Sequence, residues 1–122
     1  MKNKVNLMQL TPHFNLSEFQ CKCCCHVKIW APLLHHLEAL RLFWKNPLVI
    51  TSGFRCLRHN KKVGGVAHSL HTQGRAVDVV VMKSRQTFFC KLAKKAGFTS
   101  IIAYGKRNFV HLALKTERSY RE

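Results

Sequence analysis

The spacing of apolar residues along the chain predicts two main helices. Over Ile29–Trp44 the apolar positions recur at steps of three and four, which is typical of an amphipathic helix, and Pro32 is tolerated in its first turn. Its inner face comprises Trp30, Leu33, Leu34, Leu37, Leu40 and Trp44. A second helix is expected over Ser84–Ala96, with the Ser84 side chain as its cap and Gly97 as its stop. Its inner face would hold Phe88, Phe89, Leu92, Ala93 and Ala96.

Short runs rich in β-branched residues predict strands. They are Leu48–Thr51, Arg75–Met82, Ser100–Tyr104 and Asn108–Leu114. The glycine-punctuated segment Ser52–Gln73 shows neither period, and we expect it to be a long functional connection. Residues 1–28 look irregular, apart from a short helical turn capped by Asn15 or Ser17. Together these elements favour an α+β fold with a small, mostly antiparallel sheet.

Length and composition indicate one folded domain over residues 1–122, with residues 1–13 and 115–122 loosely ordered. The chain has 122 residues, 47% of them apolar and 10% aromatic, which excludes disordered and low-complexity classes. No apolar run approaches the ~18–20 residues that cross a bilayer, and the first ten residues lack the apolar stretch of a signal peptide. We therefore expect no membrane span and no export signal.

The charge is strongly positive, with 21 Lys and Arg against 5 acidic residues and a formal net charge of +16. Such a charge favours anionic partners such as nucleic acid, lipid or cell wall, without choosing among them. The basic pairs Lys61-Lys62, Lys94-Lys95 and Lys106-Arg107 are scattered and match no nucleic-acid-binding motif. We interpret them as a solvated basic surface and expect no specific nucleic-acid partner.

Four of the six cysteines crowd into the run Cys21–Cys25, whereas Cys56 and Cys90 stand apart. The paired C-x-x-C spacing of structural zinc sites is missing, and adjacent cysteines do not readily form a disulfide with each other. We expect reduced thiols that are partly buried in a turn. A zinc knot, or a disulfide from this run to Cys56 or Cys90, stays open as an alternative.

Asp78, the sole aspartate, lies inside an apolar strand, where an ionised carboxylate is costly unless it is paired or binds a metal. His71 precedes it on the long connection, and His111 lies in the last predicted strand. Two imidazoles and one carboxylate form a three-ligand set that leaves a fourth tetrahedral position for water, as in catalytic zinc sites. Each residue also has a structural alternative: the histidines as core residues, and Asp78 as an ion-pair partner of Arg55 or Arg75.

Several short motifs follow one another between residues 14 and 114. They are Leu16-Ser17-Glu18-Phe19-x-Cys21, Ser52-Gly53-Phe54-Arg55, His59-Asn60, Val63-Gly64-Gly65, Ser69-x-His71-x-x-Gly74-x-Ala76-x-Asp78 and Phe109-Val110-His111. In this order they resemble the zinc-dependent D-alanyl-D-alanine metallopeptidases. These are bacterial carboxypeptidases and phage endolysins whose fold is shared with the hedgehog signalling domain.

The resemblance implies a Zn²⁺ cofactor ligated by His71, Asp78 and His111. It also implies that Arg55 lies beside the metal, holding a substrate carboxylate or the carbonyl oxygen that becomes an oxyanion, and that Ser69 binds the peptide backbone. The implied activity is hydrolysis of D-amino-acid-containing stem peptides of peptidoglycan. We expect a monomeric, phage-encoded protein that is made in the bacterial host cytoplasm and acts at the cell wall.

The chain departs from the resemblance at the general base. Relatives commonly carry an aspartate two residues after the last ligand or a carboxylate three residues before it, but these positions hold Ala113 and Asn108, which cannot accept the proton. His68 and, from the tail, Glu117 are candidate substitutes; without one, hydrolysis would be slow or absent. A second hypothesis is therefore a non-catalytic zinc module that binds cell wall or a protein partner.

Overall fold

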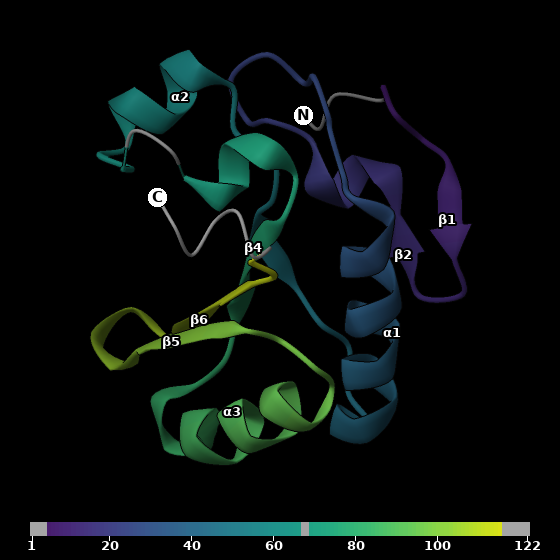
Figure 1. Ribbon diagram of the computed structural model, residues 1–122, viewed down its shortest axis with the longest axis vertical. Coiled ribbons are helices and arrows are strands. Elements are labelled where there is room, and N and C mark those ends of the chain that lie inside the picture. Colours follow the sequence, from purple (N-terminus) through teal and green to yellow (C-terminus); the bar gives the residue numbers. More distant parts are fainter. Residues whose placement is uncertain (1–4, 67–68, 116–122) are drawn as a thin grey trace.

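The computed structural model describes residues 5–66 and 69–115 as an α+β arrangement of antiparallel strands and three α-helices (Figure 1). The main sheet has the strand order β3-β4-β6-β5, with every neighbouring pair antiparallel. Its strands are β3 (Ile50–Ser52), β4 (Ala76–Val80), β5 (Ser100–Tyr104) and β6 (Phe109–Ala113). The helices are α1 (Ala31–Trp44), α2 (Leu57–Lys62) and α3 (Gln86–Lys95). The predicted α+β class is confirmed.

Helix α1 agrees with the helix expected from the three-and-four spacing, except that it begins at Ala31 rather than Ile29. The four leucines of its inner face are buried, as is Trp44 at its end. Trp30, which precedes the helix, is half-buried beneath the guanidinium of Arg75, 3.9 Å from the ring centroid. All members of the predicted inner face therefore pack against the core, and Trp30 is the one that is only partly buried there.

The start of α3 differs from the prediction. Ser84 does not cap the helix; it lies within a 3₁₀ turn, η3 (Lys83–Arg85), which leads directly into α3 without a side-chain cap. The turn already satisfies backbone donors there, because the N–H of Arg85 bonds to the carbonyl of Met82 at 2.9 Å. A serine cap is consequently not required.

The buried face of α3 is narrower than predicted. Phe89 is fully buried, whereas Phe88 is 53% exposed and lies beside Trp44, with ring centroids 6.1 Å apart. Phe88 is about 100° from Phe89 around the helix, so both cannot face the sheet. Gly97 ends the helix with φ 101°, as the sequence predicts.

Two segments without a clear period contain more structure than predicted. The long connection includes α2 and a 3₁₀ turn, and the first residues form a hairpin followed by another 3₁₀ turn. These elements are β1 (Gln9–Thr11), β2 (Phe14–Asn15), η1 (Leu16–Phe19) and η2 (Leu70–Gln73). Asn15 caps η1, which is one of the two caps expected from the sequence. Elements of one or two turns are too short to show a period and depend on tertiary contacts.

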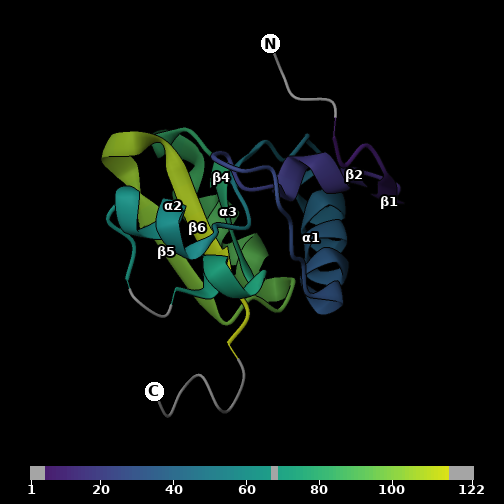
Figure 2. The same cartoon turned by 90° about the horizontal axis from the view of Figure 1, so that it is seen from above.

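The two faces of the main sheet have different surroundings, because side chains alternate along each strand. Val77 and Val79 of β4, with Val110 and Leu112 of β6, are fully buried in the core beneath α1 and α3. The intervening positions of β4 and β6 face away from this core. Viewed from above, α1 lies beside the strands and α2 lies over them (Figure 2). Among the described residues, no helix is long and apolar enough to cross a membrane.

Candidate metal centre

Two of the three predicted ligands are neighbours in the main sheet. The register between β4 and β6 pairs Asp78 directly with His111. Directly paired residues point to the same face, so both side chains project away from the apolar core. Asp78 is 7% exposed, and its Oδ1 lies 3.1 Å from His111 Nδ1. The carboxylate inside the apolar strand therefore has an imidazole partner on the next strand.

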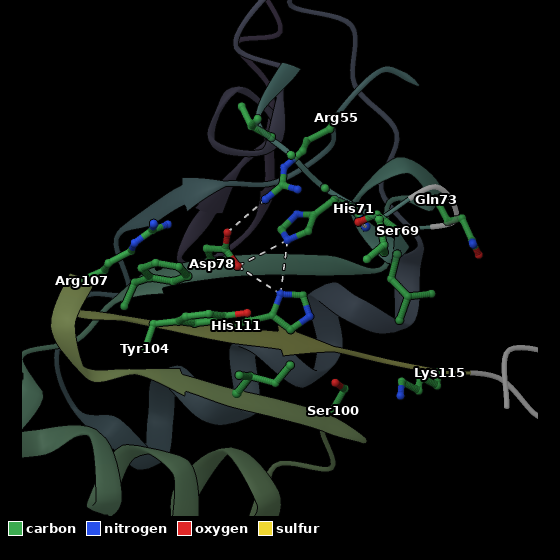
Figure 3. A pocket seen from close by; sticks show the side chains of 17 residues that line it. Arg55, Ser69, His71, Gln73, Asp78, Ser100, Tyr104, Arg107, His111 and Lys115 are labelled. Carbon is green, nitrogen blue, oxygen red and sulfur yellow. Dashed lines mark hydrogen bonds and ion pairs between the residues drawn. The ribbon is translucent and has the colours of Figure 1, made fainter. Parts of the chain in front are cut away.

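The third ligand, His71, comes from the 3₁₀ turn η2 (Figure 3). Ser69 caps this turn, since its hydroxyl accepts a hydrogen bond from the His71 backbone N–H at 3.2 Å. Gly74 ends the turn with φ 69°, and an added Cβ there would collide with the backbone that leads into α1. The turn places His71 Nε2 3.3 Å from both Asp78 Oδ1 and His111 Nδ1.

A backbone carbonyl determines which nitrogen of His71 faces the site. His71 Nδ1 lies 2.8 Å from the carbonyl oxygen of Gly53. Because a carbonyl only accepts hydrogen bonds, Nδ1 carries the proton and Nε2 presents its lone pair to the other two ligands. Histidines that bind metals commonly donate their other N–H to a carbonyl in this way.

The three donor atoms fit a tetrahedral zinc ion. They lie 3.1, 3.3 and 3.3 Å from one another. Ligand atoms at about 2.0–2.1 Å from Zn²⁺ in a regular tetrahedron are about 3.3–3.4 Å apart, which is nearly the observed spacing. His71, Asp78 and His111 thus form a group that can hold Zn²⁺, with one tetrahedral position left for another molecule.

Arg55 binds the second oxygen of Asp78, with 3.3 Å between Nη2 and Oδ2. Its Nη1 donates to Asn60 Oδ1 at 3.2 Å, and its Nε donates to Ser52 Oγ at 3.1 Å. The ion pair considered as an alternative to metal binding therefore occurs together with the ligand set. Among the described residues these contacts use three of the five guanidinium N–H donors, so that two remain for a ligand. Gly65 allows Asn60 to approach, because an added Cβ would strike its amide.

The surroundings of Asp78 favour its ionised form. Burial alone would raise the pKa of this carboxyl, but its close contacts with the imidazoles of His111 and His71 lower the pKa further than burial raises it. The net pKa lies well below the usual value for an aspartate. The group is therefore an anionic ligand throughout the physiological pH range.

The ligand set opens into a pocket of about 600 Å³ (Figure 3). Asp78 is the only acidic residue among the described residues that line it. Three basic residues line the same pocket: Arg55, Arg107 and Lys115. With one carboxylate already bound to Arg55, the pocket is suited to an anionic ligand.

Sequence reasoning missed several lining residues, among them Tyr104 and Arg107 of the β5–β6 hairpin. Tyr104 is 40% exposed and stacks on Phe109 with ring centroids 4.5 Å apart, and Figure 3 shows its side chain pointing toward His111. Arg107 lies in the turn η4 (Gly105–Arg107) between the two strands. Their place in the hairpin that carries His111 is the signal by which they could have been found.

The two positions where relatives commonly carry a base do not offer a proton acceptor. Ala113 is fully buried and faces the same side of β6 as His111. Asn108 turns away, because its Oδ1 accepts a hydrogen bond from the Lys83 backbone N–H at 3.0 Å. Neither Ala113 nor Asn108 therefore places a proton-accepting side chain beside the three ligands.

Of the remaining predicted site residues, one lines the pocket and two fall on positions that the structure does not describe. Ser69 is 7% exposed and lines the pocket, with its hydroxyl bonded to the His71 backbone. His68 and Glu117, the candidate substitutes for the base, lie outside the described residues.

Residues 12–113 match the sequence profile of the Peptidase M15 family. The chain belongs to this family. Over 73 residues it is also 36% identical to a zinc D-Ala-D-Ala carboxypeptidase from Streptomyces albus G, an alignment that covers 57% of this chain and 28% of that protein. The chain thus spans less than a third of this relative's length. Membership of the Peptidase M15 family agrees with Zn²⁺ as the cofactor of the group His71, Asp78 and His111.

Proposed function

We propose that the protein is a zinc-dependent peptidase of D-amino-acid-containing peptidoglycan stem peptides, with slow turnover. The observation that carries this proposal is the convergence of His71 Nε2, Asp78 Oδ1 and His111 Nδ1 at tetrahedral spacing on the wall of an open pocket. Support for the substrate class comes from the similarity to the Streptomyces carboxypeptidase.

The charges of the pocket suit the end of a peptide chain. A peptide with a free carboxylate would meet Arg55, Arg107 and Lys115, and the two unused N–H donors of Arg55 are adjacent to the ligand set. Attraction of this kind steers an anionic ligand and is screened by salt. The basic surface of the chain, with its formal charge of +16, would add affinity for an anionic wall.

Each residue of the site would have a distinct task. When bound, Zn²⁺ supplies a Lewis acid that polarises a carbonyl and lowers the pKa of water to about 7. Arg55 holds Asp78 in place through Oδ2 and directs its remaining donors at the substrate. His71 is oriented by its bond to Gly53, and Ser69 keeps the turn that carries it.

Slow turnover follows from the missing base. Ala113 and Asn108 cannot accept a proton, and among the described lining residues Asp78 is already engaged by Arg55 and both imidazoles. Loss of a general base typically lowers a rate by 10²- to 10⁴-fold. We therefore expect measurable but weak hydrolysis.

The test is release of D-alanine from an acylated D-Ala-D-Ala peptide and from purified peptidoglycan by the zinc-loaded protein. Slow release that a chelator abolishes, and that His71→Ala eliminates, is the expected result. His35→Ala, a change on the exposed surface of α1, serves as the matched control and should leave the rate unchanged. The proposal would be refuted if the zinc-loaded protein released no D-alanine and also showed no saturable binding of the peptide in calorimetry.

A non-catalytic zinc module that binds the same peptides is the second candidate, favoured by the absence of a base at residue 113. Ala113→Asp would place a carboxylate on the face of β6 that carries His111 and would raise hydrolysis by about 10²- to 10⁴-fold if the base is missing. Ala113→Asn is the control, because an asparagine side chain has nearly the same volume as an aspartate but carries no carboxylate that could accept a proton. Equal slow rates in all three proteins would indicate that another base already acts.

A further inference from the structure

A second group of metal-ligating side chains lies beyond the pocket. The sulfur atoms of Cys21, Cys23, Cys24 and Cys56 all lie within 4.8 Å of one another. None of these four cysteines forms a disulfide, and none of them lines the pocket that contains His71, Asp78 and His111. Thiols that merely share a turn have no reason to gather in a group of four from separate segments.

The sulfur spacing is that of a tetrahedral metal site. Cys21 Sγ lies 3.7 Å from Cys23 Sγ, and Cys23 Sγ lies 3.4 Å from Cys56 Sγ. Sulfurs bound to Zn²⁺ at about 2.3 Å in a regular tetrahedron are about 3.8 Å apart, whereas disulfide sulfurs are about 2.05 Å apart. We propose that Cys21, Cys23, Cys24 and Cys56 bind a structural zinc ion.

The backbone brings the four ligands together from two distant segments. The turn that carries the first three is closed by hydrogen bonds from Cys25 N–H to Cys21 O at 2.9 Å and from Cys21 N–H to His26 O at 2.7 Å. Cys56 comes from the N-terminal cap of α2. The second C-x-x-C pair, which the sequence lacks, is therefore replaced by a ligand that only the fold places nearby.

A close backbone contact aligns the two segments. Phe54 N–H donates to Phe19 O at 2.8 Å, and Gly53 packs so tightly on Phe19 that an added Cβ would collide with its backbone. Phe19 precedes Cys21 by two residues, and Phe54 likewise precedes Cys56 by two residues, so this contact lies next to the thiols of both segments. The ligands are consequently held in place before a metal binds.

Hydrogen-bond donors around the sulfurs suit thiolates. Four thiolates and one Zn²⁺ carry a net charge of −2, which must be offset locally. Cys56 N–H donates to Cys21 Sγ at 3.4 Å, and His59 N–H donates to Cys56 Sγ at 3.4 Å. The positive charge of the Arg58 side chain also interacts favourably with Cys23 and Cys56. These donors match an anionic cluster better than a neutral one.

The position of Cys56 gives the site a structural task. Cys56 directly follows Arg55, whose guanidinium binds Asp78 in the metal centre formed with His71 and His111. A zinc ion here would join the N-terminal segment to the loop that carries Arg55. The inference itself does not depend on the proposed peptidase activity, because the two ligand sets share no residue.

The test measures zinc by elemental analysis and X-ray absorption in a protein purified under reducing conditions. His71→Ala combined with His111→Ala removes the first centre, so that any remaining zinc belongs to the thiols. We expect one zinc ion per chain with about four sulfur neighbours at about 2.3 Å. In this background Cys56→Ser should abolish stoichiometric zinc, and serine preserves the helix cap. Cys25→Ser, from the same run but outside the group, should retain the ion.

Two measurements keep the inference open to refutation if Cys56→Ser fails to fold. Titration of the unmutated protein with a mercurial should release one zinc ion as four thiols react. Absence of thiol-bound zinc, or only nitrogen and oxygen neighbours, would overturn the inference. A mass lower by two hydrogens per cysteine pair in the reduced preparation would overturn it as well, because it would indicate disulfides.

Discussion

Replacing Asp78 with asparagine removes the one negative charge of the centre while keeping the shape of the side chain. Asp78 Oδ1 lies 3.1 Å from His111 Nδ1 and 3.3 Å from His71 Nε2, and its Oδ2 lies 3.3 Å from Arg55 Nη2. Asp78→Asn therefore affects metal affinity and, separately, the stability of the metal-free protein. The second effect is expected because the Arg55 guanidinium loses its counter-charge in a largely buried position.

The size of the stability loss follows from the surroundings of Arg55. Removing one partner of a buried ion pair typically costs about 3–5 kcal/mol. The Arg55 side chain is 14% exposed and keeps its hydrogen bonds to Ser52 and Asn60, so we expect about 2–3 kcal/mol. For a domain of this length the loss corresponds to a fall of about 6–15 °C in Tm. Zinc affinity should fall by more than about 100-fold, since even residues that only support a ligand contribute 10- to 100-fold.

Thermal unfolding of the metal-free proteins and chelator competition for zinc measure the two effects. The matched control is Asp78→Asn in an Arg55→Gln background, where no buried cation is left and the added stability loss should be under about 1 kcal/mol. A change in Tm below about 2 °C together with less than a tenfold change in zinc affinity would refute the role assigned to Asp78.

Two further predictions concern contacts around the site and on α1. Glu38→Gln should cost about 0.5–1 kcal/mol at pH 7, because Glu38 accepts hydrogen bonds from the His13 side chain and backbone, both at 2.8 Å. Burial raises the pKa of the Glu38 carboxyl, but its hydrogen bonds lower that pKa further, so the folded-state pKa lies below the unfolded value of about 4.3. The stabilisation by Glu38 is therefore complete above the unfolded pKa and is lost as the pH falls through the folded-state pKa. Equal losses of unfolding free energy for Glu38→Gln in urea at pH 7 and pH 3 would contradict this prediction. Gly65→Ala should displace the Asn60 amide and weaken peptide binding by about 10- to 100-fold in calorimetry, whereas Gly105→Ala, where an added Cβ makes only ordinary contacts, should not.

The sequence determines the elements whose signal is local. Leucines at steps of three and four define α1, a run of valines defines β4, and Gly97 ends α3 where a left-handed residue is required. Local patterns failed where the element is shorter than its period, as in α2 and η2, and where a turn replaced a side-chain cap, as at Ser84. The motifs shared with metallopeptidases also identified His71, Asp78 and His111 as a set.

The tertiary structure alone decides which of these side chains meet. The register of β4 and β6 pairs Asp78 with His111, and a shift of one residue would turn one of them into the core. The contact of Gly53 with Phe19 likewise brings Cys56 to the thiols of the N-terminal turn, although no spacing in the sequence indicates it. Contacts of this kind join residues that are far apart in the sequence. They depend on packing and strand register, which no local pattern of apolar residues encodes.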